Sequence, residues 1–200
     1  MPPVIRLYST YYCPYALRTR MVLEEKRLPY ERIEIDLKSK PADFHKVSPY
    51  GKVPVLVDGE ARIYESAIIN EYLNEKYPAP PLMPSTPEER AYVRVWIDFA
   101  NNHLMPAGFR ARQAEGEKRE KAMTAFLEHL GTMEQEIDGK RWLAGEQYTL
   151  GDIAFAPVFA RLMQEEGFDW SRFPKLDGWF ERISARPSWP ATGGLEPPED

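Results

Sequence analysis

Residues 4–26 read VIRLYSTYYCPYALRTRMVLEEK, and their pattern indicates the architecture of the first part of the chain. Its β-branched and aromatic start, Val4 to Tyr8, is typical of a short strand, and the polar residues and proline that follow mark a turn. From Pro14 to Lys26, apolar side chains recur at the three- and four-residue spacing of one buried helical face. They are Leu17, Met21 and Val22. A strand, a turn and a helix are therefore predicted, with Cys13 at the helix N-terminus.

Strand and helix patterns continue downstream of this stretch. Tyr30 to Ile35 alternates polar and apolar residues like a strand. Val53 to Val57 and Ala61 to Tyr64 flank Asp58-Gly59, a dipeptide that favours a hairpin turn. A second helix is predicted from Ser66 to Tyr77, and this order of elements indicates a thioredoxin-like α/β domain. The apolar face of the second helix carries Ile68, Ile69, Tyr72 and Leu73.

The composition changes abruptly at Pro78. The segment PAPPLMPSTP holds five prolines in ten residues, which cannot continue a helix or a central strand. We therefore expect an α/β domain over residues 1–77, a proline-rich linker over 78–87 and an all-helical domain over 88–200. The chain is expected to end in a frayed tail, GGLEPPED. The helices of the second domain are expected at Glu88 to Arg112, Lys118 to Ile137, Leu150 to Glu166 and Leu176 to Ala185.

Composition and charge argue against several classes of function. The 200 residues carry a formal net charge of -5, whereas surfaces that bind nucleic acid or anionic membrane are normally rich in Lys and Arg. No run reaches the roughly 18 apolar residues that span a bilayer, and the first residues lack the pattern of a secretory signal. We expect a cytoplasmic protein with no nucleic-acid or membrane partner. The single cysteine excludes an intramolecular disulfide and fits a reducing compartment.

Cys13 is the residue whose position points to chemistry. The thiolate is the reactive form of a cysteine, and a helix N-terminus stabilises it through partial positive charge and free amide donors. We therefore expect a lowered pKa for Cys13, with thiolate as the resting form near neutral pH. A lone cysteine is more often an inert buried residue, but this one lies where thioredoxin-like folds hold a redox site. Ala16 replaces the second cysteine of a Cys-x-x-Cys pair, so an external thiol such as glutathione must release any mixed disulfide.

Three segments carry a family resemblance: YYCPYALRTRMVL at 11–23, GKVPVL at 51–56 and IYESAII at 63–69. They resemble the cysteine-type glutathione transferases, with the omega class as the nearest match. The resemblance continues through LKSKP at 37–41, the linker and YTLGD at 148–152. It implies the glutathione transferase fold, an α/β thioredoxin-like N-terminal domain followed by an all-α domain that contributes the second-substrate pocket. It also implies glutathione as co-substrate, no metal, and a homodimer.

The resemblance implies a glutathione site around Cys13 as the catalytic residue. The other residues of the implied site are Pro14, Lys40, Val53, Pro54, Glu65 and Ser66. Val53 precedes a proline that is cis in the family, and its backbone would pair with the cysteinyl part of glutathione, as an extended peptide adds to a sheet edge. Glu65 and Ser66 would hold the γ-glutamyl end at a helix N-terminus, and Lys40 would meet the glycine carboxylate. Taken alone, Glu65-Ser66 is a helix cap and Lys40 a surface charge.

Other candidate residues are given no catalytic role. Thr149 to Asp152 has the spacing of a helix capping motif, and we assign it to folding. Tyr8 lies in the apolar pattern of the first strand, so core packing is expected for it. The histidines His45, His103 and His129 are isolated in sequence and receive no function. The sequence does not decide which side chains of the second domain line a substrate pocket; the candidates are Trp96, Phe99, Asn102, His103 and Phe109.

Three functions are compatible with these features. The leading hypothesis is a thiol transferase in which Cys13 attacks a glutathione mixed disulfide or an oxidised small molecule and is regenerated by a second glutathione. The resemblance implies deglutathionylation or dehydroascorbate-type reduction. The alternative enzyme conjugates, cleaves or isomerises an electrophile with the thiolate of glutathione. The non-enzymatic alternative is an interaction protein like the RNA polymerase-associated stringent starvation protein, and the presence of Cys13, Lys40 and Glu65-Ser66 weighs against it.

Overall fold

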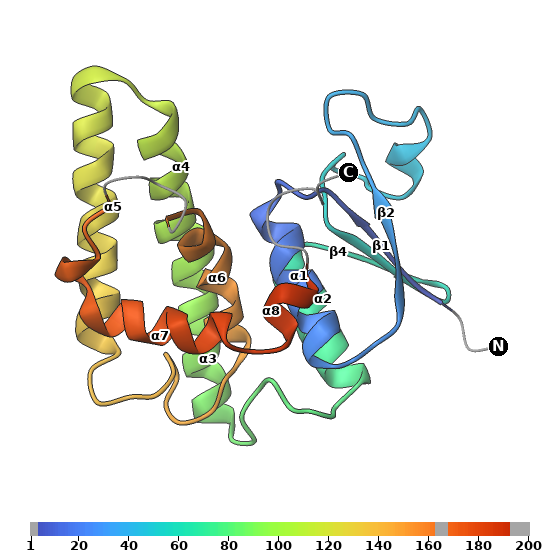
Figure 1. The fold of residues 1–200 in the computed structure, drawn as a ribbon. Helices are drawn as coiled ribbons and strands as arrows, with labels where there is room; N and C mark the ends of the chain where they lie inside the picture. The colour runs from blue at the N-terminus through green and yellow to red at the C-terminus, as the bar shows by residue number, and fades with distance from the viewer. Residues whose placement is uncertain (1–3, 163–167, 193–200) are drawn as a thin grey trace. The chain divides into compact units, whose positions relative to one another are not determined.

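The structure of the chain, a computed structural model, describes residues 4–162 and 168–192 (Figure 1). It divides into two compact units. The first holds the chain up to Pro81 together with the described residues from Arg186 onward, and the second holds Leu82–Ala185. The expected frayed tail and the last residues of the helix expected to reach Glu166 lie outside the described residues.

The first unit is an α/β layer structure. Its four-stranded sheet has the order β2-β1-β3-β4, with β1 parallel to β2 and the other neighbours antiparallel. Helices α1 and α2 lie side by side against the sheet (Figure 1). The thioredoxin-like prediction is therefore confirmed. The elements are β1 Ile5–Ser9, α1 Pro14–Glu25, β2 Tyr30–Glu34, the 3-10 turn η1 Phe44–Lys46, β3 Val55–Asp58, β4 Ala61–Tyr64, α2 Ser66–Lys76 and α8 Ser188–Ala191.

Helix α1 is buried more completely than its apolar stripe predicts. Leu17, Met21 and Val22 are fully buried, as expected. Arg18 and Arg20 are buried as well, so the helix is covered on more than one side. On α2 the prediction was partly wrong, because Ile68 is 59% exposed while Ile69 and Leu73 are buried. Helix α2 packs on α1 and on the β3–β4 hairpin, and Ile68 lies on the side that these elements leave open.

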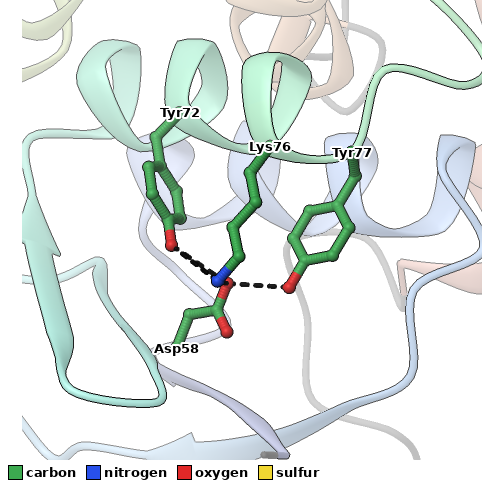
Figure 2. Close-up of polar contacts among 4 residues, drawn as sticks. All are labelled: Asp58, Tyr72, Lys76 and Tyr77. Atoms are coloured by element: carbon green, nitrogen blue, oxygen red, sulfur yellow. Dashed lines mark hydrogen bonds and ion pairs between the residues drawn. The ribbon is translucent and has the colours of Figure 1, made fainter. Parts of the chain in front are cut away.

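A buried carboxylate fastens the β3–β4 hairpin to α2 (Figure 2). Gly59 has a φ of +62°, which suits the two-residue turn after Asp58. The Asp58 Oδ2 atom accepts hydrogen bonds from Lys76 Nζ at 2.8 Å, Tyr77 Oη at 2.8 Å and Tyr72 Oη at 3.1 Å. Burial opposes ionisation of Asp58, yet the bonds from these three donors hold its pKa below the usual value.

The chain returns to the first unit after the second. Helix α8 contacts α1, and the Glu25 carboxylate receives a bidentate pair of hydrogen bonds from Arg186, both of 2.6 Å. The hydroxyl of Ser188 donates a third, at 2.5 Å. Residues 186–192 therefore belong with the α/β unit, which differs from the helical domain that we expected over 88–200. Sequence periodicity could not reveal this, because the partners are 161 residues apart.

The second unit is built from helices in its described residues, as predicted, with one isolated β-bridge between Trp142 and Gly145 in the loop before α6. The helix expected from Glu88 to Arg112 is interrupted by one π-helical segment. Pro106 has no amide hydrogen, so the carbonyl four residues earlier, that of Asn102, loses its helical donor. The elements are α3 Pro87–Phe99, the π-helical segment η2 Ala100–Leu104, α4 Met105–Gln113, α5 Gly116–Glu136, α6 Leu150–Leu162, the 3-10 turn η3 Trp170–Arg172 and α7 Pro174–Ser184.

Asp152 organises the core of the second unit. Its carboxylate is fully buried and accepts hydrogen bonds from the amides of Leu143 and Thr149, the Thr149 hydroxyl and the Trp179 indole, at 2.9 to 3.2 Å. Burial raises the pKa of Asp152 although these donors oppose the rise. The folding role that we predicted for Thr149 to Asp152 is confirmed. No helix within residues 4–162 and 168–192 has both the length and the apolar character needed to cross a membrane.

Candidate functional site

Cys13 lies at the junction of the β1–α1 loop and helix α1. Its backbone is extended, with φ -87° and ψ 114°, and Pro14 occupies the first turn of the helix. Pro14 lacks an amide hydrogen, so it leaves no donor unsatisfied at that position. The Cys13 sulfur lies 3.6 Å from the carbonyl oxygen of Val53, which accepts a hydrogen bond from the thiol. The predicted helix N-terminal position of Cys13 is confirmed.

The protonation state of Cys13 differs from the expectation. Burial raises the pKa of the Cys13 thiol above its ordinary value. The first-turn amides of Ala16 and Tyr15 and the charges of Arg18 and Arg20 act in the opposite direction, but they do not overcome the burial. The hydrogen bond to the Val53 carbonyl also belongs to the protonated form. The expected resting thiolate is therefore wrong for the free protein, because Cys13 packs against Ile35, Phe44 and Val53, which lie far from it in sequence.

The segment around Val53 and Pro54 has the geometry that the resemblance implies. The Val53–Pro54 peptide bond is cis. Val53 packs with Ile35 and Phe44, and Cys13 packs against this cluster. Among the described residues, none accepts a hydrogen bond from the Val53 amide. The Val53 carbonyl thus accepts from the Cys13 thiol, and the Val53 amide is open to pair with an extended peptide.

The start of α2 forms the second part of the candidate site. Glu65 precedes the helix with φ +67° and makes no capping hydrogen bond with its side chain. Ser66 is the first helical residue and is buried. Its hydroxyl oxygen accepts a hydrogen bond of 2.9 Å from Arg18 Nε. The first-turn amides of α2 therefore remain available for an anion, as helix N-termini provide.

Lys40 and Gly51 come together at the third part of the site. Lys40 is exposed, and a Cβ atom added to Gly51 would lie 3.5 Å from its Nζ atom. Gly51 has a φ of +61°, a conformation that glycine adopts most readily. The structure thus brings Lys40 beside the loop that leads to Val53. All the residues implied by the resemblance lie in the α/β unit.

Sequence reasoning missed a group of charged residues around the β1–α1 loop, which leads to Cys13. The Tyr11 amide donates a 2.7 Å hydrogen bond to Glu34, and the guanidinium of Arg32 lies 3.5 Å from the centroid of the Tyr11 ring. Arg32 also pairs with Glu34 at 3.0 Å. The guanidinium carbon of Arg20 lies 5.6 Å from the centroid of the Tyr11 ring, and burial lowers the pKa of Arg20 to about 10. Charged residues inside the apolar stripe of α1 were the signal in the sequence that could have revealed the basic part of this group.

The tyrosine and two of the histidines that received no function make contacts with aromatic rings. Tyr8 packs against Phe44 at a ring distance of 6.2 Å, in agreement with the core role expected for it. His103 and His129 are not isolated, because their ring centroids are 5.7 Å apart, with Phe99 against both. In the described residues no group of three or more His, Cys, Asp or Glu side chains could hold a metal ion.

Two family models match the chain. One, described as "Glutathione S-transferase, N-terminal domain", matches residues 7–81, and the other, "Glutathione S-transferase, C-terminal domain", matches residues 97–187. Among curated proteins, glutathione S-transferase U28 of Arabidopsis thaliana is 35% identical, with 90% of this chain and 84% of the relative covered. Pyrimidodiazepine synthase of Drosophila melanogaster is 33% identical, with 92% and 79% covered.

Solved structures agree with these matches. Glutathione transferase Omega 3C from Trametes versicolor superposes with a TM-score of 0.87 at 28% identity, covering 100% of this chain and 92% of that one. Rice GST1, solved in complex with glutathione, gives a TM-score of 0.89 at 26% identity, covering 96% and 91%.

Proposed function

The chain belongs to the glutathione S-transferase family, and we propose that within this family it is a glutathione-dependent thiol transferase of the cysteine type, close to the omega class. The observation that carries the proposal is the position of the Cys13 sulfur, 3.6 Å from the Val53 carbonyl oxygen. A glutathionyl group whose backbone pairs with Val53 would present its sulfur to Cys13. Cys13 would then be the catalytic nucleophile.

The site residues suit the three parts of glutathione. The Val53 amide and carbonyl would pair with the backbone of the cysteinyl residue. The hydroxyl and amide of Ser66, at the start of α2, would hold the γ-glutamyl carboxylate, and Glu65 would face its ammonium group. The ammonium of Lys40 would meet the glycine carboxylate. The rice relative was solved with glutathione, which supports glutathione as co-substrate.

The proposed reaction has two thiol–disulfide exchanges. In the first, the Cys13 thiolate attacks the glutathionyl sulfur of a mixed disulfide, forms Cys13–S–SG and releases the other half as a thiolate, which takes up a proton. In the second, the thiolate of another glutathione attacks the same glutathionyl sulfur, regenerates the Cys13 thiolate and leaves as oxidised glutathione. Over the two exchanges, the mixed disulfide is reduced to a free thiol and one glutathione is oxidised, while the substrate's own glutathionyl group supplies the other half of the oxidised glutathione.

Substrate binding provides a way to activate the thiol. In the free protein the Cys13 thiol donates to the Val53 carbonyl. A bound glutathionyl backbone would offer its own amide to that carbonyl and remove the acceptor that favours the protonated sulfur. The first-turn amides of α1 and the charges of Arg18 and Arg20, which lower the pKa of Cys13, would then act with less opposition.

Mass spectrometry of the intact protein tests the first exchange. Because Cys13 is the single cysteine, a mass increase of one glutathionyl group after treatment with oxidised glutathione reports on this residue alone. The proposal expects such an adduct at pH 8, and its loss on addition of reduced glutathione. A protein that forms no adduct between pH 7 and 9, or whose adduct reduced glutathione does not release, would contradict the proposed cycle.

One observation favours a second function, glutathione conjugation. A thiol whose pKa is raised, and which donates a hydrogen bond, can stabilise the thiolate of bound glutathione instead of attacking it. Glutathione would then be the nucleophile that attacks an electrophile. In that case Cys13→Ser, which keeps a donor, would preserve conjugation activity.

The setting of the enzyme is proposed from the family resemblance and the composition. We place it in the cytoplasm as a homodimer, in keeping with its single free thiol. The α/β unit would bind glutathione, and the helical unit would select the second substrate. The boundaries of the proposed domains are those expected from the sequence, with residues 186–192 now assigned to the α/β unit.

A further inference from the structure

Arg18 is a charged residue in the interior of the α/β unit. It lies on α1, five residues after Cys13, and only 2% of its surface is exposed. Its Nε atom donates a 2.9 Å hydrogen bond to the Ser66 hydroxyl oxygen on α2. Its guanidinium carbon lies 4.8 Å from the centroid of the Tyr15 ring. One side chain therefore extends from the helix that carries the thiol to the residue that begins the next helix.

Burying a guanidinium is costly, and structures retain buried charges where they are paired or used. Burial lowers the pKa of Arg18 to about 10, so the group is still positively charged at neutral pH. Cys13 and Glu65 are among the groups that act on this charge, and in return Arg18 acts to lower the pKa of Cys13. The positive charge of Arg18 thus interacts with both Cys13 and Glu65, at the two ends of the candidate site.

We propose that Arg18 is a positioning residue that couples the two ends of the glutathione site, by orienting the Ser66 hydroxyl and by stabilising the Cys13 thiolate. This inference rests on the proposed function, since it assigns the γ-glutamyl carboxylate to Ser66 and the reaction to Cys13. The residue acts through its two neighbours and makes no contact with the substrate itself.

The hydrogen bond between Arg18 and Ser66 has a direction that matters. Because the Ser66 oxygen accepts from the guanidinium, its own hydrogen is free to donate to an incoming carboxylate. The adjacent positive charge polarises the hydroxyl and strengthens that donation. At the other end, loss of the charge would leave the buried sulfur with fewer groups that favour its ionised form.

Two readouts distinguish coupling from a merely structural link between α1 and α2. The first is the rate of Cys13 alkylation by iodoacetamide as a function of pH, measured without glutathione, which reports the thiol pKa. The second is the Kd for S-methylglutathione, measured by calorimetry. Arg18→Met removes the charge and the donor, Arg18→Lys keeps a charge, and Ser66→Ala keeps the guanidinium. Arg6→Met, at an exposed position on β1, is the matched control.

The proposal expects a separate pattern for each variant. Arg18→Met raises the alkylation midpoint by about one pH unit and weakens S-methylglutathione binding about tenfold. Arg18→Lys keeps the midpoint near that of the wild type and still weakens binding, because the planar donor to Ser66 is lost. Ser66→Ala weakens binding and leaves the midpoint unchanged, and Arg6→Met changes neither quantity.

An unchanged midpoint in folded Arg18→Met, or an Arg18→Lys midpoint raised as far as that of Met, would overturn the electrostatic part. If Ser66→Ala binds S-methylglutathione as the wild type does, the orienting part is wrong. If Arg18→Met does not fold, as judged by circular dichroism, Arg18→Lys and Ser66→Ala still test the electrostatic and the orienting parts of the proposal. The alkylation assay needs no glutathione turnover, so it remains valid even if the proposed reaction fails.

Discussion

The Cys13 thiol is subject to two opposing influences at the scale of a single residue. Burial and the Val53 carbonyl favour the protonated form, whereas the start of α1 and two arginines favour the thiolate. In the free protein burial dominates. The residue is therefore protected in the absence of substrate and would become reactive when the Val53 carbonyl is engaged by a peptide.

This balance predicts the pH dependence of Cys13 alkylation. Because the thiol pKa is raised, the rate in the free protein should reach half of its maximum at a pH above the ordinary thiol value of about 8.5. Saturating S-methylglutathione, which cannot form a disulfide, should shift the midpoint downward. The measurement is the iodoacetamide rate from pH 6 to 10. A midpoint below pH 7 without ligand would show that burial does not raise the thiol pKa.

The strengths and limits of sequence reasoning are visible at this residue. The strand-turn-helix pattern sufficed to predict that Cys13 begins a helix, since that is a local property. The direction of its pKa shift could not be predicted, because Cys13 packs against Ile35, Phe44 and Val53, which are distant in sequence. Arg18 was missed for the same reason: its partner Ser66 lies 48 residues away.

At the scale of elements, Asp58 links the β3–β4 hairpin to α2 (Figure 2). Its pKa is lowered in the folded state, so its stabilising effect is present above the unfolded pKa and is lost as pH falls through the folded one. Asp58→Asn should lower the stability by about 2 kcal/mol at pH 7, or the Tm by roughly 4–8 °C. Thermal melts of both proteins at several pH values measure this difference.

The Asp58 prediction has an internal control. The difference in stability between wild type and Asp58→Asn should be constant above pH 5 and shrink below about pH 4, where Asp58 of the unfolded chain becomes protonated before that of the folded protein. Asp43→Asn, at an exposed position in the same unit, should melt with the wild type. A gap that persists unchanged at pH 3 would show that the carboxylate charge is not what fastens the hairpin.

Asp152, on α6, is hydrogen-bonded to the loop that precedes α6 and to α7. Its removal leaves buried donors on Leu143, Thr149 and Trp179 without an acceptor, and each such donor costs about 1–3 kcal/mol. The donors on these three residues together cost at least about 3 kcal/mol, so Asp152→Ala should lower the Tm by at least roughly 6–12 °C or prevent folding. Asp138→Ala removes an exposed carboxylate that pairs with Lys175 and should leave the Tm nearly unchanged. Equal melting of the two variants would refute this role for Asp152.

The type of each element could be predicted where the sequence pattern was long and local. Interruptions within an element could not be predicted in this way. The helix pattern from Glu88 to Arg112 masked the π-helical segment Ala100–Leu104, although Pro106 was a visible cause. Ile68 fitted the stripe of α2 but is exposed, because the position of α1 and the sheet decides which part of the stripe is covered.

At the scale of the whole molecule, the proposed homodimer has a direct test. Several large apolar side chains are exposed on the single chain, among them Tyr50 and Ile68 in the first unit and Val95 in the second. Burying such side chains is a common driving force for assembly. Size-exclusion chromatography with light scattering should give twice the chain mass of 23.2 kDa. A mass of one chain at micromolar concentration would contradict the proposed homodimer.

The order of the two units was evident from the change in composition at Pro78, but the return of the chain was not. Arg186 and Ser188 bind Glu25 on α1, so the last described segment completes the α/β unit. No local pattern in residues 186–192 indicates this, because the partner carboxylate belongs to a helix near the start of the chain. Long-range ion pairs of this kind become visible only in the folded structure.

Two activities, measured in two proteins, test whether Cys13 is a redox nucleophile. Glutathione-dependent reduction of hydroxyethyl disulfide and conjugation of chlorodinitrobenzene would be measured for the wild type and for Cys13→Ser. If Cys13 has this role, the wild type should show strong reduction that falls by at least about a hundredfold in the variant, the range seen when an essential nucleophile is removed. Reduction retained in Cys13→Ser, or weak reduction in both with conjugation kept or increased, would contradict this role.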